Sequence, residues 1–414
     1  MSEGSGSVTI QDVPSHPQSF EGEKCAVADQ SQPHSSQLPQ DSSIYDGGNH
    51  AWWTIVGAWI GSFQLFMQYI PGFFIGRAFD AGYFHYMIAL GTILQITSMF
   101  MLSLARQHQY YEVFLAQAVG MGLGQSLLFL PSLTVIGHHF KRRRALSTGI
   151  AVSGASFGGI IWPILLNEFS QRTSFANAIR ATAALCGVML LASNFLMKTK
   201  PIACGSQRPN IRVICQDSAF LVSVASAFCI NLGLFFPYFY LQLYAVNRKI
   251  SNNLAFYSLA ILNAGSALGR LLPNFFADKF GTYNLLLPCL FISSGLAFTM
   301  FAISDFPGVI VFGLLFGFWS GSYISLIPSL LAQLCNHAKE QGTRMGIAFS
   351  IVGISMLVGT PIEGSLLKSD AGHFAWSRSI IFCGTMIFCG AIGMAISRTL
   401  FVRQGRAGSR GHYV

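Results

Sequence analysis

Charged residues are scarce in this sequence. Asp, Glu, Lys and Arg make up 10% of the 414 residues, whereas soluble domains carry about 25%. Hydrophobic residues make up 52%. This composition excludes an ordinary water-soluble domain and predicts a chain that crosses a membrane several times.

Cysteine motifs are also missing. The nine cysteines form no CxxC pair, which excludes the common zinc and thiol redox motifs, and we expect them to be small apolar side chains in a reducing environment. The segment Gly154–Gly158 fits the G-x-S-x-G pattern of hydrolases, but that pattern needs a preceding strand, and here both flanks are apolar and helix-like. We therefore predict no enzyme, no catalytic residue, no metal site and no cofactor.

Long apolar stretches are abundant. Each is near the ~20 residues that a helix needs to cross the hydrocarbon layer. They predict an all-α, polytopic membrane helix bundle with eleven spans, at residues 51–75, 85–105, 111–137, 145–167, 178–197, 218–245, 254–276, 283–303, 307–333, 343–367 and 379–400.

The other segments divide the chain. Residues 1–50 contain seven acids and one base and are predicted to be a disordered acidic tail without a cleaved signal peptide. A central cytoplasmic loop, 198–217, separates an amino-terminal half of five spans (51–197) from a carboxy-terminal half of six (218–400). Residues 401–414 are predicted to be a basic cytoplasmic tail.

Basic residues gather on one side of this topology. If every stretch crosses once, the side that carries Lys141–Arg144 holds 16 of the 25 Lys and Arg residues and four of the 16 acids. Loops rich in Lys and Arg face the cytoplasm. The net charge of +9 is thus explained by the membrane topology, and we predict no nucleic-acid partner.

Two features predict close packing and internal repetition. Gly149–Gly159 is rich in Gly, Ala and Ser, which favours a helix packed against other helices rather than one that faces lipid. Gly76–Gly82 and Gly269–Gly281 both place Gly, Arg, Asp and Gly at the end of an apolar stretch. Such an echo is typical of transporters built from two repeated halves, although any tight turn collects Gly and Asp.

Several motifs occur in the order found in a known family. Asp46–Trp52 begins with Asp-Gly-Gly, and Phe140–Leu146 leads through Gly149, Ala151 and Gly154 into a small-residue helix. Further motifs are Gly76–Tyr83, Phe236–Tyr240, Gly269–Gly281 and Gly359–Ile362. Over about residues 46–400 the chain resembles the major facilitator superfamily, specifically fungal members of its monocarboxylate porter family.

The resemblance has one large departure. Members of the family have twelve spans, but here Ala51–Ile75 carries both the signature that opens the family's first helix and the turn that closes its second. About one span is therefore predicted to be missing, with the join near Ala58 and Trp59. We interpret this as a lost exon in the gene model or an impaired product.

Arg270 is the strongest candidate for a substrate-binding residue. It is predicted to lie inside a span, where a cation must face a cavity or a partner, and a guanidinium matches the planar geometry of a carboxylate. By resemblance, it stands where the family places its substrate-binding arginine. The position four residues earlier, an acid in animal members, is Ser266, which weakens the case for proton coupling through this pair. The alternative is a structural role at the interface or in a gate with Asp278.

Other polar groups were assigned from their positions in the spans. We predict that substrate also contacts Asn231, Asn263, Gln125, Tyr238 and Tyr240. The alternative, which is more common for such residues, is a contact between helices. Cytoplasmic gating is predicted for Arg77, Asp80, Arg142, Arg143, Arg144 and Asp278. Glu363 is expected at the outer interface, in contact with water.

The resemblance implies a secondary active transporter. It would move a small organic acid or a carboxylate-bearing secondary metabolite by alternating access, with protons as a candidate coupling ion and the lipid bilayer as its environment. The plasma membrane is the expected location, with the vacuole or another endomembrane as alternatives. The competing hypothesis is a non-transporting paralogue, a membrane sensor or a remnant.

Overall fold

The computed structural model describes residues 60–106, 109–140, 142–199, 211–248, 250, 252–335, 340–367 and 374–405. Every regular element within these ranges is a helix. The predicted acidic tail, the join near Ala58, most of the central loop and most of the basic tail lie outside the described residues.

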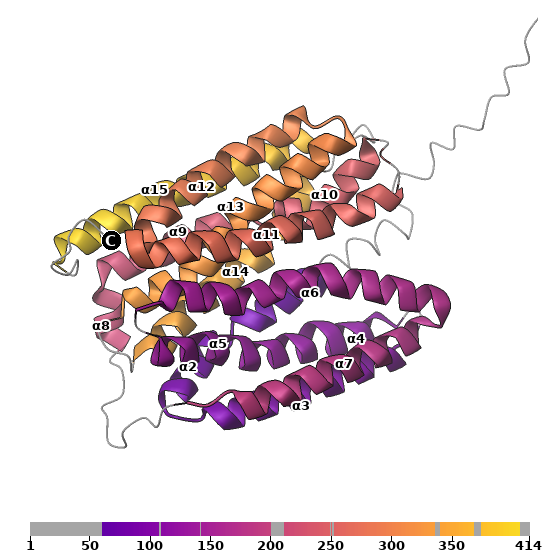
Figure 1. The fold of residues 1–414 in the computed structure, drawn as a ribbon, viewed down its shortest axis with the longest axis horizontal. Helices are drawn as coiled ribbons and strands as arrows, with labels where there is room; N and C mark the ends of the chain where they lie inside the picture. Colours follow the sequence, from indigo (N-terminus) through magenta and orange to yellow (C-terminus); the bar gives the residue numbers. More distant parts are fainter. Residues whose placement is uncertain are drawn as a thin grey trace, which may run out of the picture. The chain divides into compact units, whose positions relative to one another are not determined.

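The amino-terminal half consists of a helix over residues 60–69 followed by helices of very different length (Figure 1). These are α2 (Gly72–Asp80), α3 (Phe84–Leu104), α4 (Tyr110–Val113), the π-helix η2 (Phe114–Met121), α5 (Gly122–His139), α6 (Arg144–Arg172) and α7 (Phe175–Leu196). The segments α4, η2 and α5 follow one another without a break and form one membrane-length helix, Tyr110–His139.

The carboxy-terminal half begins with the short helix α8 (Ile211–Gln216). It continues with α9 (Ser218–Gly233), α10 (Phe236–Asn247), α11 (Asn252–Phe280), α12 (Thr282–Thr299), the 3-10 turn η3 (Met300–Ala302), α13 (Phe306–Gln333), α14 (Gln341–Leu367) and α15 (Trp376–Arg403). The turn between α9 and α10, at Leu234 and Phe235, interrupts a segment that still has the length and hydropathy of one span.

Ten helices in the described ranges are long and apolar enough to cross a membrane. The predicted helix bundle is confirmed, but the count of eleven spans is not. The first predicted span, 51–75, is broken in its described part at Ile70 and Pro71. Proline has no N–H to donate to the preceding turn. The hydroxyl of Ser350 in α14 bonds to both sides of this break, accepting from the Phe73 N–H (3.0 Å) and donating to the Ile70 carbonyl (2.9 Å).

The most extensive contacts between the two halves are made by two pairs of helices, α2 with α14 and α6 with α11 (Figure 1). Both pairs cross at glycine. A Cβ atom on Gly149 of α6 would overlap the Arg270 carbonyl oxygen of α11, and one on Gly346 of α14 would overlap the Gly72 carbonyl oxygen of α2. The predicted close packing of the Gly149 region is thus confirmed for one face of α6, although Gly154 on another face has no neighbour within 4 Å.

The predicted echo between the halves holds at its Asp and its last Gly. Gly82 and Gly281 follow α2 and α11 with φ of 94° and 93°, a backbone region that favours glycine. Asp80 and Asp278 precede them near the helix ends. Arg270 and Arg77 are not equivalent, because Arg270 lies more than a turn deeper in its helix than Arg77 does.

Gly346→Ala should destabilise the protein, because its methyl group would enter the space of the Gly72 carbonyl. Overpacking of this kind costs about 1–3 kcal/mol. We expect a lower melting temperature in detergent. The matched control is Gly154→Ala, which meets open space and should be neutral or stabilising because alanine favours a helix. Equal melting temperatures for the two variants would contradict the close crossing.

Candidate functional site

Two carboxylates join the halves at one end of the bundle, which we call the basic end because Arg77, Arg142 and Lys279 lie there. Asp278 at the end of α11 accepts from the N–H groups of Ala145 (2.9 Å) and Leu146 (3.0 Å) at the start of α6. A helix start offers free N–H groups and a positive dipole end, both of which favour a carboxylate.

Asp80 makes the equivalent contact from the other half. Located at the end of α2, it accepts from the N–H groups of Gly342 (3.0 Å) and Thr343 (2.7 Å) and from the Thr343 hydroxyl (2.6 Å) at the start of α14. Each half therefore supplies one carboxylate and one helix start to the other. This reciprocal arrangement closes the basic end.

The predicted gating cations do not pair with these carboxylates. Arg77 lies over the ring of Phe73, 5.7 Å from its centre, and Arg144 donates to the Gly137 carbonyl oxygen (3.3 Å). Arg142 and Arg143 are exposed, and no ion pair within the described ranges involves any of these four arginines. The carboxylates bind backbone N–H groups instead.

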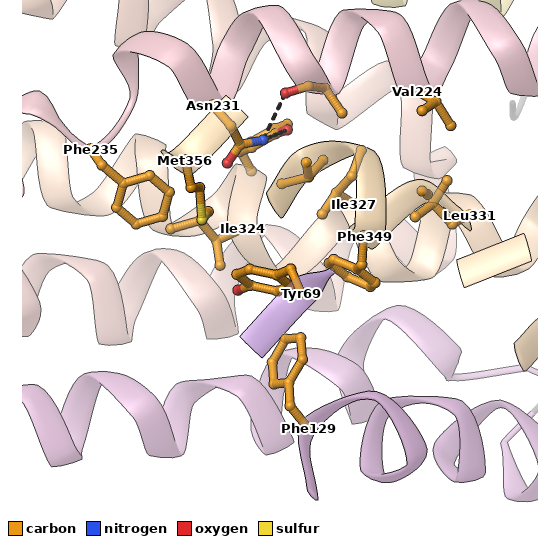
Figure 2. A pocket seen from close by; sticks show the side chains of 14 residues that line it. Tyr69, Phe129, Val224, Asn231, Phe235, Ile324, Ile327, Leu331, Phe349 and Met356 are labelled. Atoms are coloured by element: carbon orange, nitrogen blue, oxygen red, sulfur yellow. Dashed lines mark hydrogen bonds between the residues drawn. The ribbon is translucent and has the colours of Figure 1, made fainter. Parts of the chain in front are cut away.

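A cavity lies between the halves, farther into the bundle. The amino-terminal half contributes Tyr69 and Phe129, and the carboxy-terminal half contributes side chains of α9, α13 and α14 together with Phe235. Figure 2 shows the Tyr69 ring beside those of Phe349 and Phe129. Tyr69 stacks on Phe349 at 5.5 Å and meets Phe129 edge-on at 5.6 Å. The wall is thus mainly apolar and aromatic.

The polar groups of the wall are few. Asn231 donates to the Tyr323 hydroxyl (3.0 Å) and to the Ala227 carbonyl oxygen (2.7 Å), and Tyr69 supplies the remaining hydroxyl. Of the six predicted substrate contacts, Asn231 is the one that lines this cavity (Figure 2).

Arg270 is not part of the cavity wall, but Tyr69, one of its electrostatic neighbours, is. It is 6% exposed, its Nη1 donates to the Val152 carbonyl oxygen of α6 (2.7 Å), and its buried Nε has no hydrogen-bond partner in the described ranges. The electrostatic neighbours of the guanidinium are Tyr69 and Tyr238, and it does not pair with Asp278. This is a buried cation whose donors are only partly used.

Ser266 occupies the predicted position one turn from Arg270. It is fully buried, 3.2 Å from the Ser156 hydroxyl of α6, and it accepts from the Tyr238 hydroxyl at 3.5 Å. Tyr238 also lies 3.1 Å from the Ser320 hydroxyl. The predicted residues Arg270 and Tyr238 therefore share one polar region at the contact between α6 and α11.

The other predicted contacts lie elsewhere. Asn263 donates to its own helix at Leu259 (3.0 Å) and packs on Gly159. Gln125 accepts from Gln64 (3.3 Å) in the amino-terminal half. Tyr240 points to α14, where its hydroxyl donates to the Thr360 carbonyl oxygen (3.4 Å). None of the three lines the cavity.

A family comparison agrees with this architecture. The model of the Major Facilitator Superfamily matches residues 54–298 and 259–410. The chain belongs to this superfamily. The match covers both halves, as expected for two helical repeats with a cavity between them.

Two relatives of this protein come from fungi. An MFS-type transporter of Gibberella moniliformis is 30% identical over 410 residues, covering 90% of this chain and 96% of that protein. The aspyridones efflux protein of Emericella nidulans is 30% identical over 415 residues, covering 91% and 84%. The fold is similar to that of the transporter FucP in its outward conformation, with a TM-score of 0.65, 16% identity and coverage of 87% and 93%.

The burial of three ionisable side chains, Arg344, Asp217 and Glu363, was not predicted from the sequence. Arg344 at the start of α14 donates to Asp217 before α9 (2.7 Å), and their side chains are 0% and 2% exposed. Glu363 in α14 is 1% exposed, so its predicted position in contact with water is wrong. The side chain points into the carboxy-terminal half rather than outward, with Cys383 of α15 as a neighbour.

The Asp80 contact should depend on pH. Burial raises the pKa of Asp80 to about 6, although hydrogen bonds from Thr343 and Gly342 act in the opposite direction. If the basic end opened and the carboxyl became hydrated, its pKa should return to about 4. The closed state then binds the proton more tightly than the open state. Protonation of Asp80 therefore stabilises the closed state fully below about pH 4, and this stabilisation is lost as the pH rises through about 6.

This can be measured with spin labels at exposed positions on each half, at Tyr83→Cys and Phe280→Cys. The closed population should grow between about pH 7 and pH 5, and Asp80→Asn should remove that dependence. Asp305→Asn, an exposed acid far along the chain, is the control and should retain it. A pH response that survives in Asp80→Asn would assign the effect to another group.

Proposed function

We propose that this protein is a secondary active transporter that moves a small organic acid, or a carboxylate-bearing secondary metabolite, by alternating access. The observation that carries the proposal is Arg270, a buried and incompletely bonded cation beside a cavity between two repeated halves. Intramembrane cations default to a functional role because their burial is costly.

Alternating access is supported by the way the halves are joined. At the basic end, the contacts are two carboxylates on helix starts, and such contacts can be replaced by water when the end opens. Rigid halves that rock around a central site are common among repeated transporters. We propose that the basic end faces the cytoplasm, as its Lys and Arg content favours.

The substrate class follows from the chemistry of the cavity. An aromatic wall favours an apolar body, and the guanidinium offers a fork matched to a carboxylate. An apolar acid would satisfy both, with its carboxylate turned towards Arg270 and Tyr238. This agrees with the proposed similarity to the monocarboxylate porter family.

Export is the proposed direction, and the plasma membrane is the proposed location, with the vacuole or another endomembrane as alternatives. The support is the relative that is named an aspyridones efflux protein. Protons are the proposed coupling ion. A non-transporting paralogue is not favoured, because relatives named as transporters or efflux proteins align with most of this chain.

The predicted missing helix remains a separate hypothesis about this chain. Sequencing the transcript tests it directly. A transcript that contains additional coding sequence near the codons of Ala58 and Trp59 would identify a lost exon. A transcript without it would show that the cell makes the protein with this shorter sequence.

Arg270→Lys tests the substrate site. Lysine keeps the charge but loses the planar fork, so transport of labelled carboxylates into proteoliposomes should fall about tenfold or more, which corresponds to ~1.4 kcal/mol or more. The control is Arg172→Lys, an exposed arginine paired with Glu168, which should transport normally. Unchanged uptake kinetics in Arg270→Lys would remove Arg270 from the site.

A further inference from the structure

Glu363 is a buried acid without the partners that the other buried charges have. Arg344 and Asp217 bind each other, and Arg270 donates to a carbonyl oxygen. Glu363 is 1% exposed, makes no ion pair among the described residues, and its Oε1 has no hydrogen-bond partner there. An ionised carboxylate in this position would be very costly, so we expect the neutral acid.

The neighbours of Glu363 come from two helices, α10 and α15. Ser379 of α15 donates its hydroxyl to the Glu363 carbonyl oxygen (3.0 Å). The Tyr240 hydroxyl of α10 lies close to the next residue, since a Cβ on Gly364 would be 2.8 Å from it. Cys383 of α15, 1% exposed, is a further electrostatic neighbour. None of these groups is a cation.

The titratable groups that face Glu363 are therefore Tyr240 and Cys383. The titratable groups on the other helices packed against α14 do not face Glu363. Tyr69 stacks on Phe349, Tyr323 binds Asn231, Cys229 of α9 faces Cys389, and Asp80, Cys335 and His138 lie towards the basic end. No Lys or Arg in the described ranges is an ion-pair partner for the carboxyl.

Glu363 also lies where helices can bend. Pro361, two residues earlier, removes a hydrogen bond within α14. The end of α9 is wedged beside it, because a Cβ on Gly359 would lie 2.8 Å from the Leu232 carbonyl oxygen and one on Gly233 would lie 2.7 Å from that of Cys383. The chain then breaks at Leu234 and Phe235 before α10.

The same region is connected to the cavity. Met356 of α14 and Phe235 at the α9–α10 break both line it. Glu363 follows Met356 by seven residues on the same helix face, about 10 Å along the axis. A movement that reshapes the cavity wall at Phe235 would therefore also change the surroundings of Glu363.

We propose that Glu363 is the proton-binding site of this transporter. The carboxyl carries a proton in the conformation described here and releases it when the opposite conformation admits water beside it. The carboxylate takes a proton from one compartment, which forms one O–H bond. That bond breaks when the proton is released into the other compartment, so one proton crosses with each cycle. A proton can bias the equilibrium between the two conformations because they differ in proton affinity, and coupling follows when the substrate also distinguishes them. The assignment rests on the proposed transport function.

Infrared spectroscopy of the purified protein tests the protonation itself, without any substrate. The difference spectrum between the wild type and Glu363→Gln at neutral pH should contain the C=O band of one protonated carboxylic acid. A carboxylate band in its place would show that Glu363 is ionised and would overturn the proposal.

Proteoliposome transport tests the coupling. If one proton accompanies one monoanion, a gradient of one pH unit supports about tenfold accumulation of a labelled acid, since tenfold is ~1.4 kcal/mol. Glu363→Gln should lose this dependence on the gradient, Glu363→Asp should restore part of it, and Glu168→Gln, at an exposed acid, should behave like the wild type.

The outcomes separate the two proposals. If the wild type moves no acid but shows the protonated band, the proposed function and the coupling role of Glu363 both fail, although the carboxyl does hold a proton. If the wild type accumulates acid and Glu363→Gln does so equally with the same gradient, the coupling role of Glu363 is wrong while the transport function stands. Size-exclusion profiles confirm that each variant is folded.

Discussion

The structure depends on how charge is placed at the ends and inside of helices that have lipid as their solvent. At the basic end, two carboxylates meet two helix starts, Asp80 on α14 and Asp278 on α6. The N–H groups that they bind would otherwise need water. The same contacts therefore satisfy four backbone donors and hold the halves together, and any opening must hydrate both partners.

Three buried charges, Arg344, Asp217 and Arg270, illustrate two different solutions to the same constraint. Arg344 and Asp217 neutralise each other inside one half, where breaking the pair would leave an isolated buried charge. Arg270 lies at the contact between the halves. Its Nη1 donates to the Val152 carbonyl oxygen, whereas its Nε has no hydrogen-bond partner in the described ranges. A satisfied pair fixes structure, whereas an unsatisfied group beside a cavity is available for a ligand.

Much of the fold could be predicted from the sequence, because apolar length and the placement of Lys and Arg are local properties. The position of Asp278 at a helix end and the packed face around Gly149 were accessible for the same reason. The site was less accessible. Hydropathy does not predict which way a side chain faces. Tyr240 was predicted to contact substrate and Glu363 to contact water, but both side chains point into the carboxy-terminal half. Two of the three groups that donate to Asp80 are backbone N–H groups, which no side-chain pattern encodes.

The break at Pro71 makes the backbone of the amino-terminal half depend on a side chain of the carboxy-terminal half. Its exposed backbone groups, the Phe73 N–H and the Ile70 carbonyl, are bonded by Ser350 of the opposite half. In hydrocarbon, unpaired backbone groups are not tolerated. If α14 withdrew, the kinked segment would have to recruit water or straighten, so the shape of the amino-terminal half at Pro71 would depend on contact with α14.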